Sequence, residues 1–192
     1  MPVEIAKGYC GYAPDDPLHA PYHNREYGFP IADDNALFER LVLEINQAGL
    51  SWGLMLKKRA GFNAAYANFD IAKVARFGAR DKARLLKDAG IIRNRLKVNA
   101  AIENAKRIQA IQKSHGSFAK WLKAHHPMRK EDWVKLFKKE FVFTGGEIVG
   151  EFLMSIGYLP GAHRDDCPVG IKLAKRKSML PWLKAAPANG WK

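Results

Sequence analysis

Apolar residues recur at helical spacing along most of residues 34–157, and residues that favour helix ends separate one run from the next. The first run begins near Asp34, which we expect to be its N-cap. The longest covers about residues 95–114 and is followed by Gly116, a residue type that commonly ends helices. Alternating apolar and polar residues, the pattern of a strand, form no run of useful length. The sequence therefore predicts an all-α fold, a bundle of orthogonally packed helices.

The turn between the first two predicted helices brings an acid and an indole together. Glu44 follows Leu41 by one helical turn, so its carboxylate lies on the apolar face of the first helix rather than on the solvated face. Gly49 is expected to end that helix, and Ser51 is expected to cap the next one, which begins with Trp52. Two interpretations are open. Either Glu44 is solvated on the rim of a helical hairpin with Trp52 in the core, or the two side chains meet in a site.

The charge of the chain favours a polyanionic partner. It carries 32 Lys and Arg against 19 Asp and Glu, a formal net charge of +13. Nucleic acid is the commonest polyanion that such a chain meets. An anionic membrane surface, or a basic surface with no nucleic-acid role, would give the same balance. With 192 residues, 47% of them apolar, the chain is long enough for one domain with a real core.

The two ends of the chain differ from the middle. Residues 1–7 are predicted to be a disordered lead, residues 8–170 a single domain, and residues 171–192 a basic, proline-containing tail. The tail is either an arm that contacts DNA or a disordered end. The first residues lack the apolar segment of a secretory signal, and no run of 18 apolar residues occurs. We therefore expect a cytoplasmic protein that does not associate with membranes.

Two cysteine–histidine pairs lie far apart in the sequence. Cys10 and His23 fall in an irregular segment, and His163 and Cys167 are spaced to share one face of a helical turn. Two thiolates and two imidazoles form a closed tetrahedral zinc set, which would fix the irregular segment to the C-terminal end. Spacing alone leaves free thiols open as the commoner alternative, since six histidines offer many accidental pairings. The other four histidines are expected at the surface: His19, His115, His125 and His126.

Two glycine-containing turns between predicted helices are candidate phosphate sites. One spans residues 141–147 and the other residues 88–95. A short turn before a helix directs free backbone N–H groups outward, where they can bind an anion. The alternatives are an ordinary turn between two helices, and a helix C-cap followed by solvated basic residues. The candidate contacts to a DNA backbone are Gly90, Arg93, Lys97, Gly145 and Gly146.

Several motifs in a fixed order resemble those of one known family. They are Cys-Gly-Tyr at 10–12, Tyr-His-Asn-Arg-Glu-Tyr-Gly at 22–28, LVLEINQAGLSW at 41–52, Leu-Lys-Lys-Arg at 56–59, Asp-Ala-Gly-Ile-Ile-Arg-Asn-Arg at 88–95, Phe-Val-Phe-Thr-Gly at 141–145 and the final His163-x3-Cys167. The set resembles the signature of the 3-methyladenine DNA glycosylase I family, from about residue 8 to residue 168. That resemblance implies a helix-hairpin-helix DNA glycosylase that removes 3-methyladenine during base-excision repair.

The resemblance also implies roles for individual residues. Glu44 would recognise the methylated base, and Leu50, beside Gly49, would be the wedge that fills the space left by the extruded base. Structural zinc would be held by the four residues of the two cysteine–histidine pairs. Tyr12 and Tyr27 stand where the family usually has Trp, which puts the shape of the pocket in question. The residues expected to line the base pocket are Tyr12, Tyr22, Tyr27, Glu44 and Trp52.

The chemistry of the lesion explains why a carboxylate would suit this pocket. Methylation at N3 makes adenine cationic, so the glycosidic bond is already weakened, and a damaged base is cheaper to extrude than a normal one. Glu44 is the expected catalytic residue, because a buried carboxylate is costly unless a positive partner compensates it. No lysine is placed to attack the sugar, so we expect a monofunctional, monomeric enzyme acting on double-stranded DNA that contains alkylated bases. The rival is a non-catalytic, zinc-stapled helical module that binds DNA or RNA.

Overall fold

The computed structural model describes residues 8–176, 180–188 and 190–191, and all regular structure within these ranges is helical, as predicted. The α-helices are α2 (Ala20–Arg25), α3 (Asp34–Gln47), α4 (Trp52–Ala65), α5 (Ile71–Val74), α6 (Ala79–Lys87), α7 (Arg95–His115), α8 (Phe118–His125), α9 (Lys130–Glu140), α10 (Gly146–Ser155), α11 (Pro168–Lys175) and α12 (Pro181–Lys184). Three short 3-10 helices complete the set: η1 (Tyr9–Gly11), η2 (Ala13–Asp15) and η3 (Ala67–Phe69). The predicted lead, residues 1–7, lies outside the described residues.

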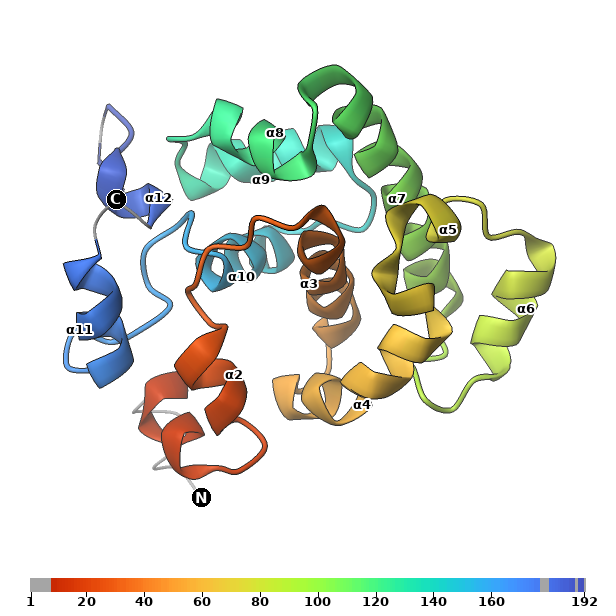
Figure 1. Ribbon diagram of the computed structural model, residues 1–192, viewed down its shortest axis with the longest axis horizontal. Helices are drawn as coiled ribbons and strands as arrows, with labels where there is room; N and C mark the ends of the chain where they lie inside the picture. The colour runs from red at the N-terminus through yellow and green to blue at the C-terminus, as the bar shows by residue number, and fades with distance from the viewer. Residues whose placement is uncertain (1–7, 177–179, 189, 192) are drawn as a thin grey trace.

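Helix α3 is the central element of the fold. It packs against α4, α5, α7, α8 and α10, and Figure 1 shows it near the middle of the molecule. Leu37, Phe38 and Leu41 on its apolar face are fully buried. Because so many helices meet on α3, a side chain on its inner face has only protein or an internal cavity to face.

The start of α3 corrects one predicted cap. Asp33, not Asp34, is the N-cap, and its carboxylate accepts a hydrogen bond from the Ala36 N–H at 2.8 Å. The Asp34 carboxylate instead accepts from the backbone N–H groups of Phe118 and Ala119 at 2.9 and 3.0 Å. Asp34 therefore helps to cap α8, a helix far along the chain, and so fixes α8 to α3.

The turn between α3 and α4 has the predicted construction. Gly49 has a φ of 79°, a left-handed conformation that glycine adopts without steric cost. The Ser51 side chain caps α4 by accepting from the Leu54 N–H at 3.2 Å. Lys97 of α7 adds a contact that the sequence does not predict. Its Nζ donates to the carbonyl oxygens of Asn46 and Ala48 at 2.8 and 2.7 Å, so it neutralises the C-terminal end of α3.

The N-terminal segment is more ordered than predicted. It forms η1, η2 and α2 rather than an irregular stretch. His19 was expected at the surface but is buried, with 8% of its surface exposed, because the Tyr9 hydroxyl lies 3.1 Å from its Nδ1. Helix α6 begins at Ala79 with Gly78 as N-cap, and Asp81 accepts from the Gly78 N–H at 3.0 Å.

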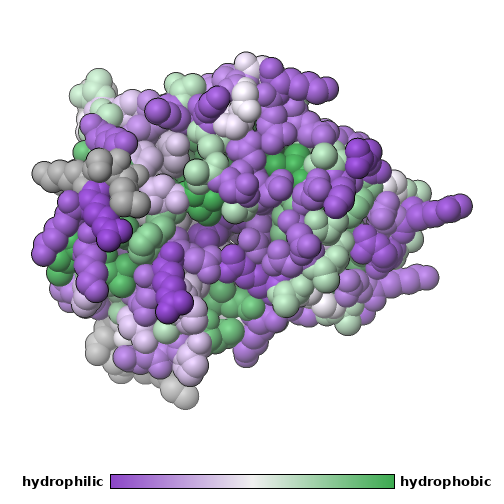
Figure 2. All heavy atoms as spheres, in the orientation of Figure 1, coloured by the Kyte–Doolittle hydropathy of each residue, from purple (hydrophilic) through white to green (hydrophobic). Residues whose placement is uncertain are grey.

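The described part of the basic tail packs onto the body of the protein. Leu173 of α11 and Leu180 are buried, and the Trp182 N–H donates to the Gly157 carbonyl at 3.3 Å. Helix α11 lies beside the N-terminal helices in Figure 1. The face in Figure 2 is mainly hydrophilic, with apolar side chains in separate patches. Within the described ranges, no helix is long and apolar enough to cross a membrane.

Candidate active site

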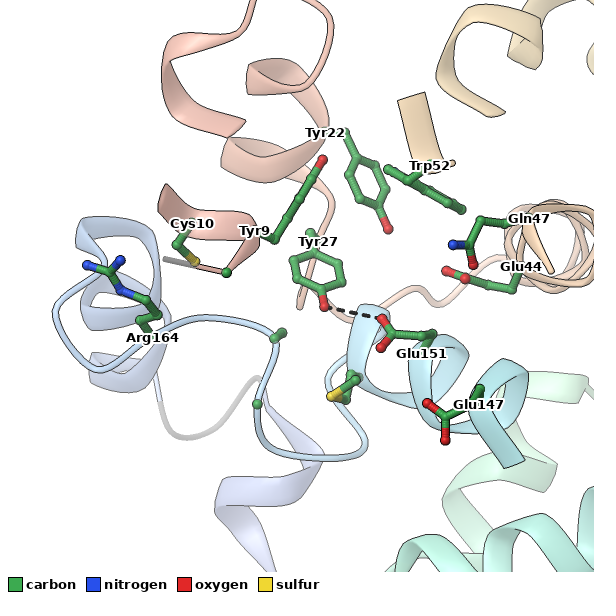
Figure 3. Close-up of a pocket in the computed structure, with 14 residues that line it drawn as sticks. Tyr9, Cys10, Tyr22, Tyr27, Glu44, Gln47, Trp52, Glu147, Glu151 and Arg164 are labelled. Carbon is green, nitrogen blue, oxygen red and sulfur yellow. Dashed lines mark hydrogen bonds between the residues drawn. The ribbon is translucent and has the colours of Figure 1, made fainter. Parts of the chain in front are cut away.

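A cavity of about 550 Å³ opens between the N-terminal segment, α3, the start of α4 and α10. Figure 3 shows tyrosine, tryptophan and glutamate side chains that converge on it from these separate elements. Three predicted pocket aromatics and the predicted acid line it. Its lining includes Tyr9, Tyr22, Tyr27, Glu44, Trp52 and Glu151.

Glu44 projects from the inner face of α3 into this cavity. Only 4% of its surface is exposed, so the interpretation of a solvated rim residue is wrong. Burial raises the pKa of its carboxyl to about 8. The Arg40 guanidinium opposes this shift, and the charge of Glu151 adds to it. No hydrogen-bond donor reaches this carboxylate from the part of the chain that the structure describes. The cavity thus contains a buried acid whose ionised form lacks a direct partner, which suits a cationic ligand.

Two aromatic rings form the side of the cavity next to Glu44. Tyr22 and Trp52 lie with their ring centroids 4.9 Å apart, and Tyr27 follows at 5.7 Å from Tyr22. The Trp52 indole Nε1 is buried and meets no acceptor among the described residues. An unpaired buried donor costs about 1–3 kcal/mol.

Arg40 fixes the position of Tyr22. Its Nη1 donates to the Tyr22 hydroxyl at 2.8 Å, and its guanidinium carbon lies 4.7 Å from the Tyr22 ring centroid. Its Nη2 pairs with Glu26 at 3.2 Å, so this buried charge is compensated. Sequence reasoning did not identify Arg40. The signal was its spacing, one helical turn before Glu44 on the same helix.

Tyr9 takes the place in the cavity wall that was expected for Tyr12. The Tyr9 ring lies 5.2 Å from Tyr27 and 5.5 Å from Tyr12 in edge-on arrangements. Tyr12 packs behind it, against His19 at 5.4 Å, and does not line the cavity. The short helices η1 and η2, which the sequence pattern does not reveal, turn the first of these two tyrosines inward.

Glu151 is a further acid in the cavity, and sequence reasoning did not identify it. It lies on α10, half-buried, and the Tyr27 hydroxyl donates to its Oε2 at 3.5 Å. Its signal was a charged residue inside an apolar helical run, between Val149 and Phe152, which are fully buried.

The four residues of the two cysteine–histidine pairs meet in one cluster. Their ligand atoms all lie within 4.8 Å of one another, so the structure contains a Cys₂His₂ site that could bind a metal. Sγ of Cys167 lies 3.7 Å from Nε2 of His23 and 3.6 Å from Nδ1 of His163, and Sγ of Cys10 lies 3.5 Å from the same Nδ1. Ligands at ordinary zinc distances in a tetrahedron have sulfur–nitrogen separations of about 3.6 Å.

The other ring nitrogen of each histidine also has an oxygen partner. His163 Nε2 lies 2.7 Å from the Tyr27 carbonyl oxygen, and His23 Nδ1 lies 2.8 Å from Asn24 Oδ1. An N–H donated to each oxygen leaves the lone pair of the nitrogen that faces the cysteines free, which is the arrangement of metal-bound histidines. The donor set and its supporting hydrogen bonds therefore fit a metal ion.

The sequence model of the methyladenine glycosylase family matches residues 12–169. The chain belongs to this family. It is 33% identical to the DNA-3-methyladenine glycosylase of Haemophilus influenzae over 178 residues, which cover 83% of this chain and 96% of that protein. It is 48% identical to DNA-3-methyladenine glycosylase 1 of Escherichia coli over 97 residues, but that match covers 50% of this chain and 52% of that protein. The predicted enzyme class, a glycosylase, is confirmed.

Solved structures of the family share the fold. A crystal structure of 3-methyladenine DNA glycosylase I superposes with a TM-score of 0.76 at 33% identity, covering 83% of this chain and 97% of that one. A Staphylococcus aureus structure described as showing how 3-methyladenine is recognised gives 0.76 at 32% identity, covering 85% and 97%. The helical architecture predicted from the sequence is therefore that of methyladenine glycosylases.

The residues predicted to contact DNA lie in different environments. Leu50, next to Gly49 in the α3–α4 turn, is 40% exposed, and Arg93 is exposed. The Gly90 N–H donates to Asp88 Oδ1 at 2.7 Å, and Lys97 is buried at the end of α3. These last two groups therefore have internal partners rather than being free for a phosphate. Gly145 is the exposed N-cap of α10, which begins at Gly146.

Proposed function

We propose that this methyladenine glycosylase hydrolyses the N-glycosidic bond of 3-methyladenine in alkylated double-stranded DNA. It releases the free base and leaves an abasic site, without cutting the strand. The observation that carries the proposal is the buried carboxylate of Glu44 in an aromatic cavity of a strongly basic chain. The positive charge of the chain favours binding to DNA. The aromatic rings favour a planar base in the cavity, and the carboxylate favours a base that carries a positive charge. The names of the relatives supply the lesion.

In this reaction Glu44 accepts a hydrogen bond from the exocyclic amine and compensates the positive charge of the extruded base. Tyr22 and Trp52 pack on its faces, and Arg40 holds Tyr22 in position through the 2.8 Å hydrogen bond. Only the ionised form of Glu44 complements a cationic base. Binding of the cation therefore lowers the raised pKa of Glu44 toward its usual range.

We infer that the Cys₂His₂ cluster holds structural zinc. A set of two thiolates and two imidazoles is typical of structural rather than catalytic zinc. The ion would join the N-terminal segment that carries Tyr9, Tyr22 and Tyr27 to the C-terminal end of the chain. Its contribution to repair would be to hold the wall of the cavity.

The exposed turns would hold the duplex. The backbone N–H groups at the start of α10, at Gly145 and Gly146, are suited to a phosphate in the manner of a helix-hairpin-helix motif, and Arg93 would contact a second one. Leu50 would enter the stack where the damaged base has left. We expect the enzyme to act as a monomer in the cytoplasm.

The test is base release from methylated genomic DNA, with the freed bases identified by chromatography. We expect 3-methyladenine in the product and no release of 7-methylguanine. Glu44→Ala should abolish release while the affinity for undamaged duplex changes less than about twofold, because the phosphate contacts lie elsewhere. If zinc-replete, folded wild-type protein binds duplex and releases no base, the rival binding module is the correct function.

A further inference from the structure

The cavity lining includes two carboxylates that the reaction described above does not use, the exposed Glu147 and the half-buried Glu151. Glu151 reaches it from α10, while Glu44 reaches it from α3, and Figure 3 shows both side chains directed into the same space. The two acids stand in a chain whose formal net charge is +13. Placing them near each other is costly, since the charge of Glu151 raises the pKa of Glu44. A ligand that carries positive charge removes this cost.

The two acids lie at different depths. Glu44 is buried, whereas Glu151 is half-buried and therefore nearer the solvent. An extruded nucleotide enters base first, and its sugar stays toward the mouth because the sugar remains bonded to the DNA backbone. With the base at Glu44, the acid that faces the sugar is therefore Glu151.

The surroundings of Glu151 suit a group that accepts a proton. Burial raises the pKa of its carboxyl, the neighbouring Glu147 adds to the shift, and Lys130 and the Tyr27 hydroxyl oppose it. Tyr27 holds one carboxylate oxygen through the 3.5 Å hydrogen bond, which orients the group without a salt bridge to neutralise it. A carboxylate with these properties can take a proton from water and can stabilise a cation beside it.

We propose that Glu151 is a second catalytic residue, which acts on the sugar while Glu44 holds the base. As the bond between C1′ and the base nitrogen breaks, its electron pair goes to the cationic base, which leaves as neutral 3-methyladenine. The Glu151 carboxylate stabilises the positive charge that develops at C1′. The oxygen of a water molecule then bonds to C1′, and the proton that it loses goes to Glu151. This inference rests on the proposed function.

The test is Glu151→Gln, which keeps the size of the side chain and an oxygen that can accept from Tyr27 but removes the charge. We expect the single-turnover rate of 3-methyladenine release to fall about 100-fold, the lower end of the range for a positioned proton acceptor. The affinity for free 3-methyladenine, measured by titration calorimetry, should change less than about threefold because the base contacts are at Glu44. If Glu151 had only a structural role, its substitution would lower the release rate and the affinity for the free base together.

Glu147→Gln is the matched control. Glu147 lies one helical turn before Glu151 on α10, its side chain is 91% exposed, and it pairs with Lys130 at 3.2 Å. Glu147→Gln removes the same charge from the same helix and the same cavity lining, but from a side chain that solvent screens, so the release rate should fall less than about threefold.

Three outcomes would overturn the role of Glu151. The first is a Glu151→Gln rate within threefold of wild type. The second is an equal loss in Glu147→Gln, which would mean a general field effect. The third is a loss of free-base affinity that matches the loss of rate, which would make Glu151 a base-recognition residue. Failure of the proposed function itself is distinguishable, because wild-type protein would then release no 3-methyladenine.

Discussion

Glu44 is the residue at which stability and function oppose each other. Its folded-state pKa of about 8, against an ordinary value of 4.5, means that folding disfavours the ionised carboxylate. Below pH 4.5 the group is neutral in both states and costs nothing. As the pH rises from 4.5 to 8 the unfolded chain gains from ionisation and the folded chain does not, so the free energy of unfolding falls. Above about pH 8 the loss is complete.

Glu44→Gln should therefore stabilise the free protein in a pH-dependent way. We expect its melting temperature to exceed that of wild type by roughly 5–10 °C at pH 9, corresponding to a few kcal/mol, and by much less at pH 5. Thermal unfolding of both proteins across this pH range measures the difference. Equal melting temperatures at every pH would mean that burial does not disfavour the ionised form of Glu44.

The sequence predicts some pocket residues better than others for a physical reason. Helical periodicity places Glu44 on the apolar face of its helix, and the predicted cap at Ser51 places Trp52 at the start of the next helix. Both positions can therefore be predicted from local sequence. Tyr9 and Glu151 enter the cavity only because α10 and the N-terminal segment meet on α3, and no local pattern encodes that meeting. Tyr12 was expected in the wall from the resemblance to the glycosylase family, whereas the short helices η1 and η2 that place Tyr9 there have no local signal.

At the scale of elements, most helices were predicted because their ends carry their own signals. Gly116 and Ser117 end α7 and begin α8, and Asp70 caps α5, as their residue types suggest. The errors arise where a helix end is completed by another element. Asp34 caps α8 from α3, and Lys97 caps the end of α3 from α7. Contacts of this kind are tertiary and cannot be found from sequence spacing.

Lys97 offers a test that separates a structural cation from a DNA contact. Lys97→Met should lower the free energy of unfolding by about 1–3 kcal/mol, because two carbonyl groups at the end of α3 lose their donor. It should leave the salt dependence of duplex binding unchanged. Denaturant unfolding and binding isotherms at several salt concentrations measure the two effects.

Arg93→Ala is the comparison for Lys97, since Arg93 is an exposed residue near the start of the same helix. We expect unchanged stability and a reduction of about one in the slope of log affinity against log salt concentration. If Lys97→Met instead produces the reduced slope, Lys97 leaves the end of α3 to meet DNA.

At the scale of the whole molecule, the Cys₂His₂ cluster joins two distant parts of the chain. We expect elemental analysis to find about one zinc per chain. Removal by a chelator should lower the melting temperature and the rate of base release together, because the tyrosines of the cavity wall lie on the segment that the ion holds. Readdition of zinc should restore both. A metal-free protein with full stability and activity would contradict the structural role.

The cluster also determines when during its synthesis the protein can acquire its fold. Cys10 and His23 leave the ribosome early, but their partners His163 and Cys167 are made only after nearly all the helices. At common rates of translation the interval is roughly 10 to 30 s. Throughout it the nascent N-terminal segment holds a thiol and an imidazole without their partners, and the cavity lacks the wall that α10 supplies. We therefore expect base excision to begin only with the nearly finished polypeptide, so that a shorter nascent chain leaves no abasic sites behind.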